Sequence, residues 1–543
     1  MGAFARIREY LKGHGAGYTL RRLRQVFRQR YLGTYDRRRE KEAATDAELA
    51  EQREHQPEAG TVSIVVPVYN TEPDMLEELV RSLSEQTYAD IDVVLYNAGT
   101  REETRRVLGR IKDPRFRVIH GAENLGISGN TNAAVREARG EYVALCDHDD
   151  VMAPDAIWRA AEVIAAEHPD VIYTDEDRVM ENNRHHMDPH YKPDWNRETL
   201  NGDNYICHLA VIRKALYDEV GGLRSGFDGS QDHDLFLRLS EKTDRFHHIP
   251  KVLYSWREVQ SSRSHTDLDT CLQAGCRAVE EHEARMGRTV SALPVNKAIR
   301  LWYDVDPDAA VEALIFGPSE DACRQCLAAL EDDSSWRNLS AALVVADETN
   351  RISSLNEAAA GSRADYLLLL DAGVYGFSRH FIRELMMYAQ MDHIAGCAPV
   401  LTDRHGRITH GGFAVGVSGG AACIHEGLKA GAGGMYDVMN KARNVAAVSP
   451  VCMMVRRDAW VDLDPVYRTG LVGAHLGLRQ RRAGRRFVVT PHATAIREKC
   501  PMLLSGRSRD REDLLRFHTK WGTHPHDPCY SSLLNRKKAD YSF

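Results

Sequence analysis

Between residues 61 and 150, short apolar runs alternate with segments of helical periodicity. Four of these runs have the composition of buried strands: residues 62–67, 91–96, 117–119 and 142–145. In the segment after the first run, apolar residues recur every three or four positions at Met75, Leu76, Leu79, Val80 and Leu83. Strands that alternate with helices predict a doubly wound α/β sheet, which binds ligands outside the carboxyl ends of its strands.

An acidic cluster follows the fourth run directly. Asp147, Asp149 and Asp150 place three carboxylates within four residues. Their mutual repulsion favours a bound cation, and hard oxygen ligands suit Mg²⁺ or Mn²⁺. An acidic turn in which Asp149 or Asp150 caps the following helix explains the same residues. The motif alone leaves both interpretations open.

Other polar clusters follow later strand-like runs. They are Asp175-Glu176-Asp177, the segment 229–235 that leads into a helix with Arg238, and the run 253–257. Their spacing does not show that they meet, but a sheet of this kind would need them all at one edge.

Composition narrows the class of protein. A chain of 543 residues with 43% hydrophobic and 27% charged residues predicts two or three globular domains. The net charge of −7 argues against a nucleic-acid-binding protein. The sequence shows neither a membrane-spanning run nor a secretory signal, and its eleven cysteines are scattered, so we expect a cytoplasmic protein. The lone pair Cys323 and Cys326 indicates buried thiols more than zinc or redox chemistry.

Residues 1–60 are expected to form a basic helical extension and a linker. Residues 1–41 contain twelve basic and three acidic residues, a local charge of +9. Apolar residues at helical spacing accompany them. This pattern fits an amphipathic helix on the anionic inner face of a membrane, or helices docked on the protein with their arginines in solvent.

Residues 61 to about 300 resemble the family 2 glycosyltransferases, which have the GT-A fold. The most similar branch builds bacterial surface polysaccharides of rhamnan or O-antigen type. The motifs that carry the resemblance are ordered and collinear: residues 62–70, 124–132, 140–150, 174–177, 192–195, 221–234 and 254–257.

The resemblance implies a reaction. An acceptor hydroxyl, on a growing glycan or a lipid-linked precursor, would attack the anomeric carbon of a nucleotide-diphospho-sugar with inversion. Asp149 and Asp147 would bind Mg²⁺ or Mn²⁺, Asp147 alternatively the ribose, with Asp150 in support. Asp232 would be the general base. As an isolated motif, Gln231-Asp232 fits a helix N-cap better than a catalytic base.

The resemblance also implies roles for further residues. Four would support the site: Asp234, Arg238, Trp256 and Arg257. The nucleotide-sugar site would contain Pro67, Tyr69, Asn97, Asn124, Gly126, Asn132 and Asp147. On the acceptor side we expect Asp175, Asp177 and Trp195. The histidines of one polar loop fit an acceptor-facing loop better than a metal site: His185, His186 and His190.

Two positions depart from the family pattern. Asn97-Ala98 stands where most members have an acidic pair that reads the nucleotide base. Ser255 stands where related sequences often have a histidine, so a candidate metal ligand or phosphate contact is missing there. Because neither change touches the acidic cluster or Asp232, we still expect an active enzyme.

The sequence then echoes itself. Residues 138–147 match 362–371, and later segments match at a nearly constant offset, which predicts a second GT-A domain in tandem. Where the first copy has its acidic cluster, the second has Asp371-Ala372-Gly373-Val374, and Gly473 stands in place of Asp232. We therefore expect a catalytic domain at 61–304, an inactive copy at 305–505 and a C-terminal tail at 506–543. The inactive copy would hold acceptor glycan, act as a scaffold or merely pack.

Three other functions fit parts of the sequence. A non-catalytic glycan-binding or scaffold protein would explain Ala98, Ser255 and the inactive copy. A nucleotidyltransferase would need a glycine-rich phosphate loop after the first strand, which residues 67–70 do not offer. A hydrolase would use two carboxylates around a sugar, but the cluster at a strand end favours a diphosphate.

Overall fold

The computed structural model describes residues 34–180, 185–258, 268–333, 336–499 and 508–543. The chain divides into two compact units. Unit 1 consists of two segments, the chain up to Lys192 and Asn204–Ala278. Unit 2 consists of Pro193–Asp203 and Val279–Phe543. The predicted boundary at residue 304 therefore lies inside unit 2.

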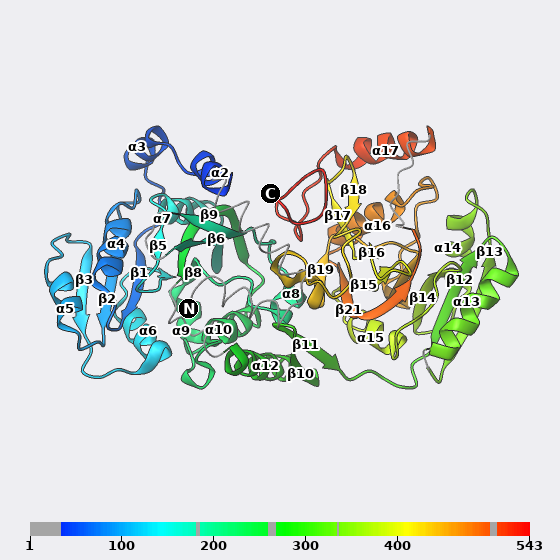
Figure 1. Ribbon diagram of the computed structural model, residues 1–543, viewed down its shortest axis with the longest axis horizontal. Coiled ribbons are helices and arrows are strands. Elements are labelled where there is room, and N and C mark those ends of the chain that lie inside the picture. The colour runs from blue at the N-terminus through cyan, green and yellow to red at the C-terminus, as the bar shows by residue number, and fades with distance from the viewer. Residues whose placement is uncertain (1–33, 181–184, 259–267, 334–335, 500–507) are drawn as a thin grey trace. The chain divides into compact units, whose positions relative to one another are not determined.

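Unit 1 is built on one mixed sheet with the strand order β3-β2-β1-β4-β8-β6-β9-β5, and β7 pairs with β6 (Figure 1). Strands β1, β2, β3 and β4 are parallel, whereas β8 runs antiparallel to both β4 and β6. The strands are β1 (Val62–Val68), β2 (Ile91–Asn97), β3 (Phe116–His120), β4 (Tyr142–Leu145), β5 (Val151–Met152), β6 (Val171–Met180), β7 (His186–His190), β8 (Ala210–Arg213) and β9 (Phe246–Glu258). The predicted α/β fold is thereby confirmed for this unit.

Helices cover this sheet. Alternate residues of β1, such as Ile64 and Val66, pack with Leu79 of α4 and Ile157 of α7 in one hydrophobic core, and α6 packs against β1 and β2. The helical elements are α2 (Thr34–Glu42), α3 (Asp46–Glu54), α4 (Pro73–Ser84), α5 (Glu102–Gly109), α6 (Gly126–Glu137), α7 (Ala156–Glu167), α9 (Lys214–Glu219), η1 (Ser225–Phe227), α10 (Gln231–Ser240) and α12 (Leu268–Arg285), which continues into unit 2.

Unit 2 contains a second mixed sheet with the order β13-β12-β14-β20-β15-β21-β19, and β16 pairs with β15. From β13 to β21 its parallel and antiparallel pairs follow the same succession as β2-β1-β4-β8-β6-β9 in unit 1. Even the register agrees, because Tyr142 faces Arg213 and the matching Tyr366 faces Arg456.

The sheet strands of unit 2 are β12 (Val311–Gly317), β13 (Leu339–Val345), β14 (Tyr366–Asp371), β15 (Ile394–Thr402), β16 (Ile408–His410), β19 (Arg443–Val445), β20 (Cys452–Arg456) and β21 (Arg486–Ile496). Two hairpins add β10 (Val290–Val295), β11 (Ala298–Tyr303), β17 (Phe413–Val415) and β18 (Ala421–Cys423). The helices are α8 (Arg197–Gly202), α13 (Glu320–Asp333), α14 (Arg351–Gly361), α15 (Phe381–Ala389), η2 (Met435–Asn440), η3 (Arg457–Ala459), α16 (Leu471–Arg482) and α17 (Ser508–Trp521).

Residues 193–203 are tied to the rest of unit 2 by hydrogen bonds. The buried carboxylate of Glu198 accepts from Asn444 Nδ2 at 2.6 Å, and Asn444 N donates to Thr199 Oγ1 at 3.1 Å. The C-terminal tail belongs to unit 2 and packs within it, because Val415 N donates to the buried Asp527 of the tail at 2.8 Å.

Most of the predicted basic extension lies outside the described residues, which begin at residue 34. Its described end, α2, docks on unit 1. Tyr35 is fully buried and donates its hydroxyl to Asp177 Oδ2 at 2.8 Å, and Arg39 Nε donates to the same oxygen at 2.9 Å. Within the described ranges, no helix combines the length and the apolar composition needed to cross a bilayer.

Candidate functional site

Asp147, Asp150 and His208 bring one potential ligand atom each to within 4.8 Å of one another. The two carboxylates belong to the turn after β4, and His208 lies just before β8. Because β8 runs antiparallel to β4, with Leu145 opposite Ala210, the two segments meet at the same sheet edge. His208 Nε2 lies 3.6 Å from Asp147 Oδ2.

Tyr254 of β9 connects the three members of this group. Its ring stacks on His208 with 5.0 Å between the ring centroids. Its hydroxyl donates to Asp150 Oδ2 at 2.6 Å and accepts from Asp147 N at 3.1 Å. The phenol therefore fixes both the acidic turn and the imidazole.

The acidic turn suits a cation. Burial, reinforced by Asp149 and Asp147, raises the pKa of the Asp150 carboxyl well above its ordinary value, and burial also raises the pKa of Asp149. A cation would relieve the cost of holding several carboxylates together in a low dielectric. Two hard oxygens and an imidazole nitrogen fit a divalent ion such as Mn²⁺.

The predicted supporting residues Arg257 and Trp256 lie beside this turn in the sheet. Arg257 is fully buried; its Nε donates to Asp149 O at 2.6 Å and its backbone N to Asp150 Oδ1 at 2.7 Å. The guanidinium also pairs with Glu78 at 2.7 Å. Trp256 lies under the guanidinium of Arg178, 4.8 Å from ring centroid to Cζ. Arg257 therefore holds the backbone of the acidic turn.

Asp232, the predicted base, is the second residue of α10 and is partly buried. Burial raises its pKa to about 6; Asp147 acts in the same direction and His208 opposes them. Because both Asp147 and His208 influence its pKa, Asp232 lies within electrostatic range of these two residues.

The neighbouring Asp234 has a different environment. It is fully buried and accepts hydrogen bonds from Arg224 Nε at 3.0 Å and from Arg238 Nη2 at 2.7 Å. Although burial opposes ionisation, the two arginines lower the pKa of Asp234. Asp234 and Arg238 therefore fix the helix that presents Asp232.

Among the predicted nucleotide-binding residues, Tyr69 presents an exposed aromatic ring. It follows β1, which contains Pro67, and is 47% exposed. Asn97 at the end of β2 is only 1% exposed; its Nδ2 lies 3.2 Å from His120 Nδ1 and its Oδ1 accepts from Gly99 N at 3.0 Å.

The amides of two further candidates bond to the protein itself. Asn124 Oδ1 accepts from Gly126 N at 3.1 Å, which shapes the left-handed turn at Gly126, where φ is +75°. Asn132 Oδ1 accepts from the hydroxyl of Tyr217 at 2.6 Å and from Leu223 N at 2.9 Å. The side chain of Asn132 therefore braces the fold, and the nucleotide contact expected for it stays a prediction.

The residues expected on the acceptor side are buried instead. Asp175 and Asp177 are fully buried, and Trp195 belongs to unit 2 with 6% of its surface exposed. Asp175 accepts from Lys192 N at 2.8 Å, and Asp177 accepts from Tyr35 and Arg39. The carboxylates of Asp175 and Asp177 therefore bond to protein groups, and an acceptor contact by these residues or by Trp195 stays a prediction.

The histidines of the 185–190 segment each pair with a different carboxylate. His185 lies 3.2 Å from Asp36, and His186 lies 3.1 Å from Asp177. His190 lies 3.3 Å from Glu176. In the described part of the chain, these histidines do not join a group of metal-ligand type.

His208 is the site residue that sequence reasoning missed. No motif surrounds it, and only the pairing of β8 with β4 places it beside Asp147. It supplies an imidazole to a site where Ser255 had suggested that one was lacking. Ser255 Oγ instead accepts from Arg39 Nη2 at 3.2 Å.

In unit 2, Asp371 is the last residue of β14. This position corresponds to the start of the acidic turn after β4 in unit 1. The carboxylate of Asp371 lies 3.7 Å from Arg497 Nη2. The Asp371 carboxylate of unit 2 is thus paired with an arginine.

Comparisons with known proteins show which sequences this chain resembles. Residues 63–221 match the family model Glycosyl transferase family 2. The uncharacterized protein y4gI of Sinorhizobium fredii is 33% identical over 537 residues, covering 88% of this chain and 58% of that protein. The O-antigen biosynthesis protein RfbC of Myxococcus xanthus is 29% identical over 519 residues, covering 88% of this chain and 40% of that protein. The chain thus spans about half the length of these curated relatives.

Solved structures give weaker similarities. A mannosyltransferase from Pyrobaculum calidifontis, in complex with GDP-Man and Mn²⁺, is 19% identical with a TM-score of 0.32, covering 43% of this chain and 65% of that chain. The family match rests on the sequence, and it spans β1 to α9, including the acidic turn and His208. Residues 63–221 of this chain are therefore similar to the catalytic family described as Glycosyl transferase family 2.

Proposed function

We propose that this chain is an inverting, metal-dependent glycosyltransferase of surface-polysaccharide assembly. It moves a sugar from a nucleotide-diphospho-sugar to a hydroxyl of a growing glycan or a lipid-linked precursor. The observation that carries the proposal is the convergence of Asp147, Asp150 and His208 in the segment that matches the family 2 model. Asp232, whose pKa both Asp147 and His208 influence, would act in the same site. The similarity to RfbC supports the pathway.

The acidic turn and His208 form the donor side. Both oxygens of Asp150 already accept hydrogen bonds from Tyr254 and Arg257, whereas the nearest ion-pair partner of Asp149 is His148 at 3.8 Å. Although Asp150 belongs to the group that converges in the structure, its oxygens are already engaged. We therefore assign Asp147, Asp149 and His208 as ligands and Asp150 as the residue that shapes the turn. A bound divalent cation would neutralise charge on the diphosphate leaving group. The exposed ring of Tyr69 offers the nucleotide a flat contact.

Asp232 forms the acceptor side. With a pKa of about 6, its carboxylate is mostly ionised at neutral pH and still basic enough to take a proton from a hydroxyl. A single base on the face of the sugar opposite the leaving group inverts the anomeric centre. Asp234 and Arg238 hold the helix so that Asp232 reaches that face.

We also propose that unit 2 is a degenerate GT-A copy that scaffolds the enzyme or holds acceptor glycan. Its strand order repeats that of unit 1, which supports duplication. Glycine cannot take a proton, so Gly473 does not replace Asp232. The pairing of Asp371 with Arg497 also argues against a cation there.

The proposal also includes a contact between the N-terminal segment and the membrane. Residues 1–41 would bind the anionic inner face of the membrane, because their charge of +9 attracts acidic lipid. A liposome pull-down with residues 1–60 at low salt tests this. Equal recovery with neutral and anionic vesicles would show that the segment has no such role.

The activity test uses the full chain with Mn²⁺. A thermal-shift screen of sugar nucleotides first identifies the donor, because a true donor stabilises the folded state by mass action. Release of nucleoside diphosphate is then measured with the wild-type chain and with Asp232→Asn. Loss of release in the variant, with donor binding kept, supports the enzyme. No release with any donor would favour the alternative, a non-catalytic glycan-binding scaffold.

A further inference from the structure

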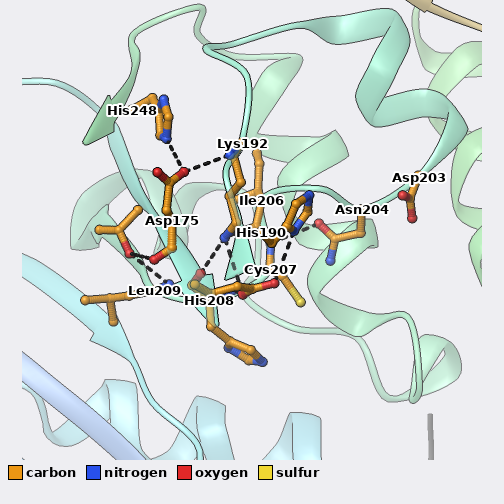
Figure 2. Close-up of polar contacts among 12 residues, drawn as sticks. Asp175, His190, Lys192, Asp203, Asn204, Ile206, Cys207, His208, Leu209 and His248 are labelled. Atoms are coloured by element: carbon orange, nitrogen blue, oxygen red, sulfur yellow. Dashed lines mark hydrogen bonds and ion pairs between the residues drawn. The ribbon is translucent and has the colours of Figure 1, made fainter. Parts of the chain in front are cut away.

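A buried ion pair lies directly behind His208. The side chain of Lys192 is fully buried, and its Nζ lies 3.3 Å from Glu176 Oε2. Figure 2 shows Lys192 reaching the chain segment that contains Ile206, Cys207 and His208. A buried ammonium is costly unless its donors are satisfied, so its partners indicate what it holds in place.

The partners of this pair are the backbone groups around His208. Lys192 Nζ donates to Ile206 O at 2.6 Å and to His208 O at 2.5 Å. Glu176 Oε2 accepts from His208 N at 3.1 Å. The two charged side chains therefore hold both the N–H and the C=O of one residue.

The ion pair is itself fixed from the other side. Asp175, next to Glu176 on β6, accepts from Lys192 N at 2.8 Å and lies 2.8 Å from His248 Nε2 (Figure 2). His190 Nδ1 lies 3.3 Å from Glu176 Oε1. Asp175 and Glu176 thus act from inside the fold, by holding the lysine that holds His208.

We infer that Lys192, through its ion pair with Glu176, is a positioning residue that aims the His208 imidazole at Asp147. Tyr254 fixes the face of the ring by stacking, and Lys192 fixes the backbone from which the ring projects. The inference rests on the proposed function, because it assumes that His208 binds the cation. Second-layer groups of this kind typically change metal affinity by about 10- to 100-fold.

The test uses Mn²⁺ bound to the full chain in the absence of donor and acceptor. Imidazole coordination adds a ¹⁴N modulation to the electron spin echo of Mn²⁺, and the same samples give the dissociation constant by titration. We expect Lys192→Met to lose most of the ¹⁴N modulation and to weaken Mn²⁺ binding about 10-fold. His208→Ala should remove the modulation completely.

Two further variants make the result specific. Lys242→Met removes a surface lysine of unit 1 that pairs with Glu219, and it should leave both readouts unchanged. Lys192→Met combined with Glu176→Gln removes both buried charges, so it tests the same idea if the single variant fails to fold.

Two negative outcomes can be told apart in this experiment. A wild-type ¹⁴N modulation that persists in Lys192→Met or in the double variant, with unchanged affinity, would overturn the role of Lys192 while leaving the cation site intact. A wild-type chain that does not bind Mn²⁺, or binds it without nitrogen modulation, would overturn the metal role of His208 and this inference with it.

Discussion

Tyr254 donates its hydroxyl to Asp150 over 2.6 Å, which ties strand β9 to the acidic turn after β4. The same oxygen accepts from Asp147 N, and the same ring stacks on His208. One phenol therefore touches every member of the candidate metal group. Predictions about the site begin with this residue.

Tyr254→Phe keeps the ring and removes the hydroxyl. We expect a loss of about 1–3 kcal/mol in the free energy of unfolding, because Asp150 stays buried with one hydrogen bond fewer. The increase in Tm that Mn²⁺ produces should also shrink. Tyr142→Phe is the matched control, since Tyr142 donates to Pro169 O at 2.8 Å and is equally buried. If both variants lower the Mn²⁺ effect alike, Tyr254 has no special part in the site.

Asp149→Asn and Asp150→Asn should separate ligand from support. Asp150→Asn should cost roughly 1–3 kcal/mol of stability, because an amide nitrogen must face Tyr254 or the backbone N–H of Arg257. Asp149→Asn should weaken Mn²⁺ binding at nearly unchanged stability. Calorimetric titration and denaturant unfolding measure the two effects. An unchanged Mn²⁺ affinity in Asp149→Asn would assign the ligand role to Asp150.

Turnover should depend on the ionisation of Asp232. Because burial raises the pKa of Asp232 to about 6, the base is increasingly protonated below that pH and the rate should fall. The rate should level off above about pH 7. Initial rates from pH 5 to 8 at saturating donor give the profile. Donor affinity should change much less over the same range; a rate that is flat down to pH 5 would exclude Asp232 as the base.

Asp371→Ala in unit 2 should leave turnover unchanged, whereas Asp147→Ala should abolish it. Asp371→Ala also removes the ion pair between Asp371 and Arg497. Because these two side chains are partly exposed, the stability cost should be at most about 1 kcal/mol. Diphosphate release and thermal unfolding are measured in parallel. A large loss of turnover at normal stability would show that the second copy takes part in catalysis.

The stability of unit 2 should depend on Glu198 in a pH-dependent way. Burial opposes ionisation of Glu198, but His393 and Asn444 outweigh it and lower the pKa to about 2. A folded pKa below the unfolded value of about 4.5 stabilises the fold by about 3 kcal/mol above pH 4.5, and this is lost as the pH falls toward 2. Wild type and Glu198→Gln should therefore differ in unfolding free energy at pH 7, and the difference should shrink below pH 4.5 and vanish only as the pH approaches about 2. A constant difference would contradict the ionised state of Glu198.

Much of the fold follows from local patterns. Apolar runs such as residues 62–67 and the helical spacing of Leu76, Leu79 and Leu83 predict the β1–α4 unit that the structure contains. The echo of residues 138–147 in 362–371 predicts the second sheet, and the register of Tyr142 and Tyr366 bears out that alignment. Strand and helix periods are properties of neighbouring residues, so the sequence displays them directly.

The roles of individual polar residues follow less well. Asp175, Asp177 and Asn132 belong to family motifs, yet their side chains are bonded inside the fold. A motif shows that a polar residue is needed at a position. Whether it faces a ligand or another protein group depends on burial, which sequence spacing does not specify.

By itself, the sequence determined that strands and helices alternate and that an acidic cluster of Asp147, Asp149 and Asp150 follows one of the strands. It also determined that the second copy lacks this cluster. Only the tertiary structure decided that His208 joins them, that Tyr254 links them and that Lys192 holds His208 from behind. The physical reason is that these contacts depend on the antiparallel pairing of β8 with β4 and on long-range register. Side chains from segments some sixty to a hundred residues apart meet only when the whole sheet has formed.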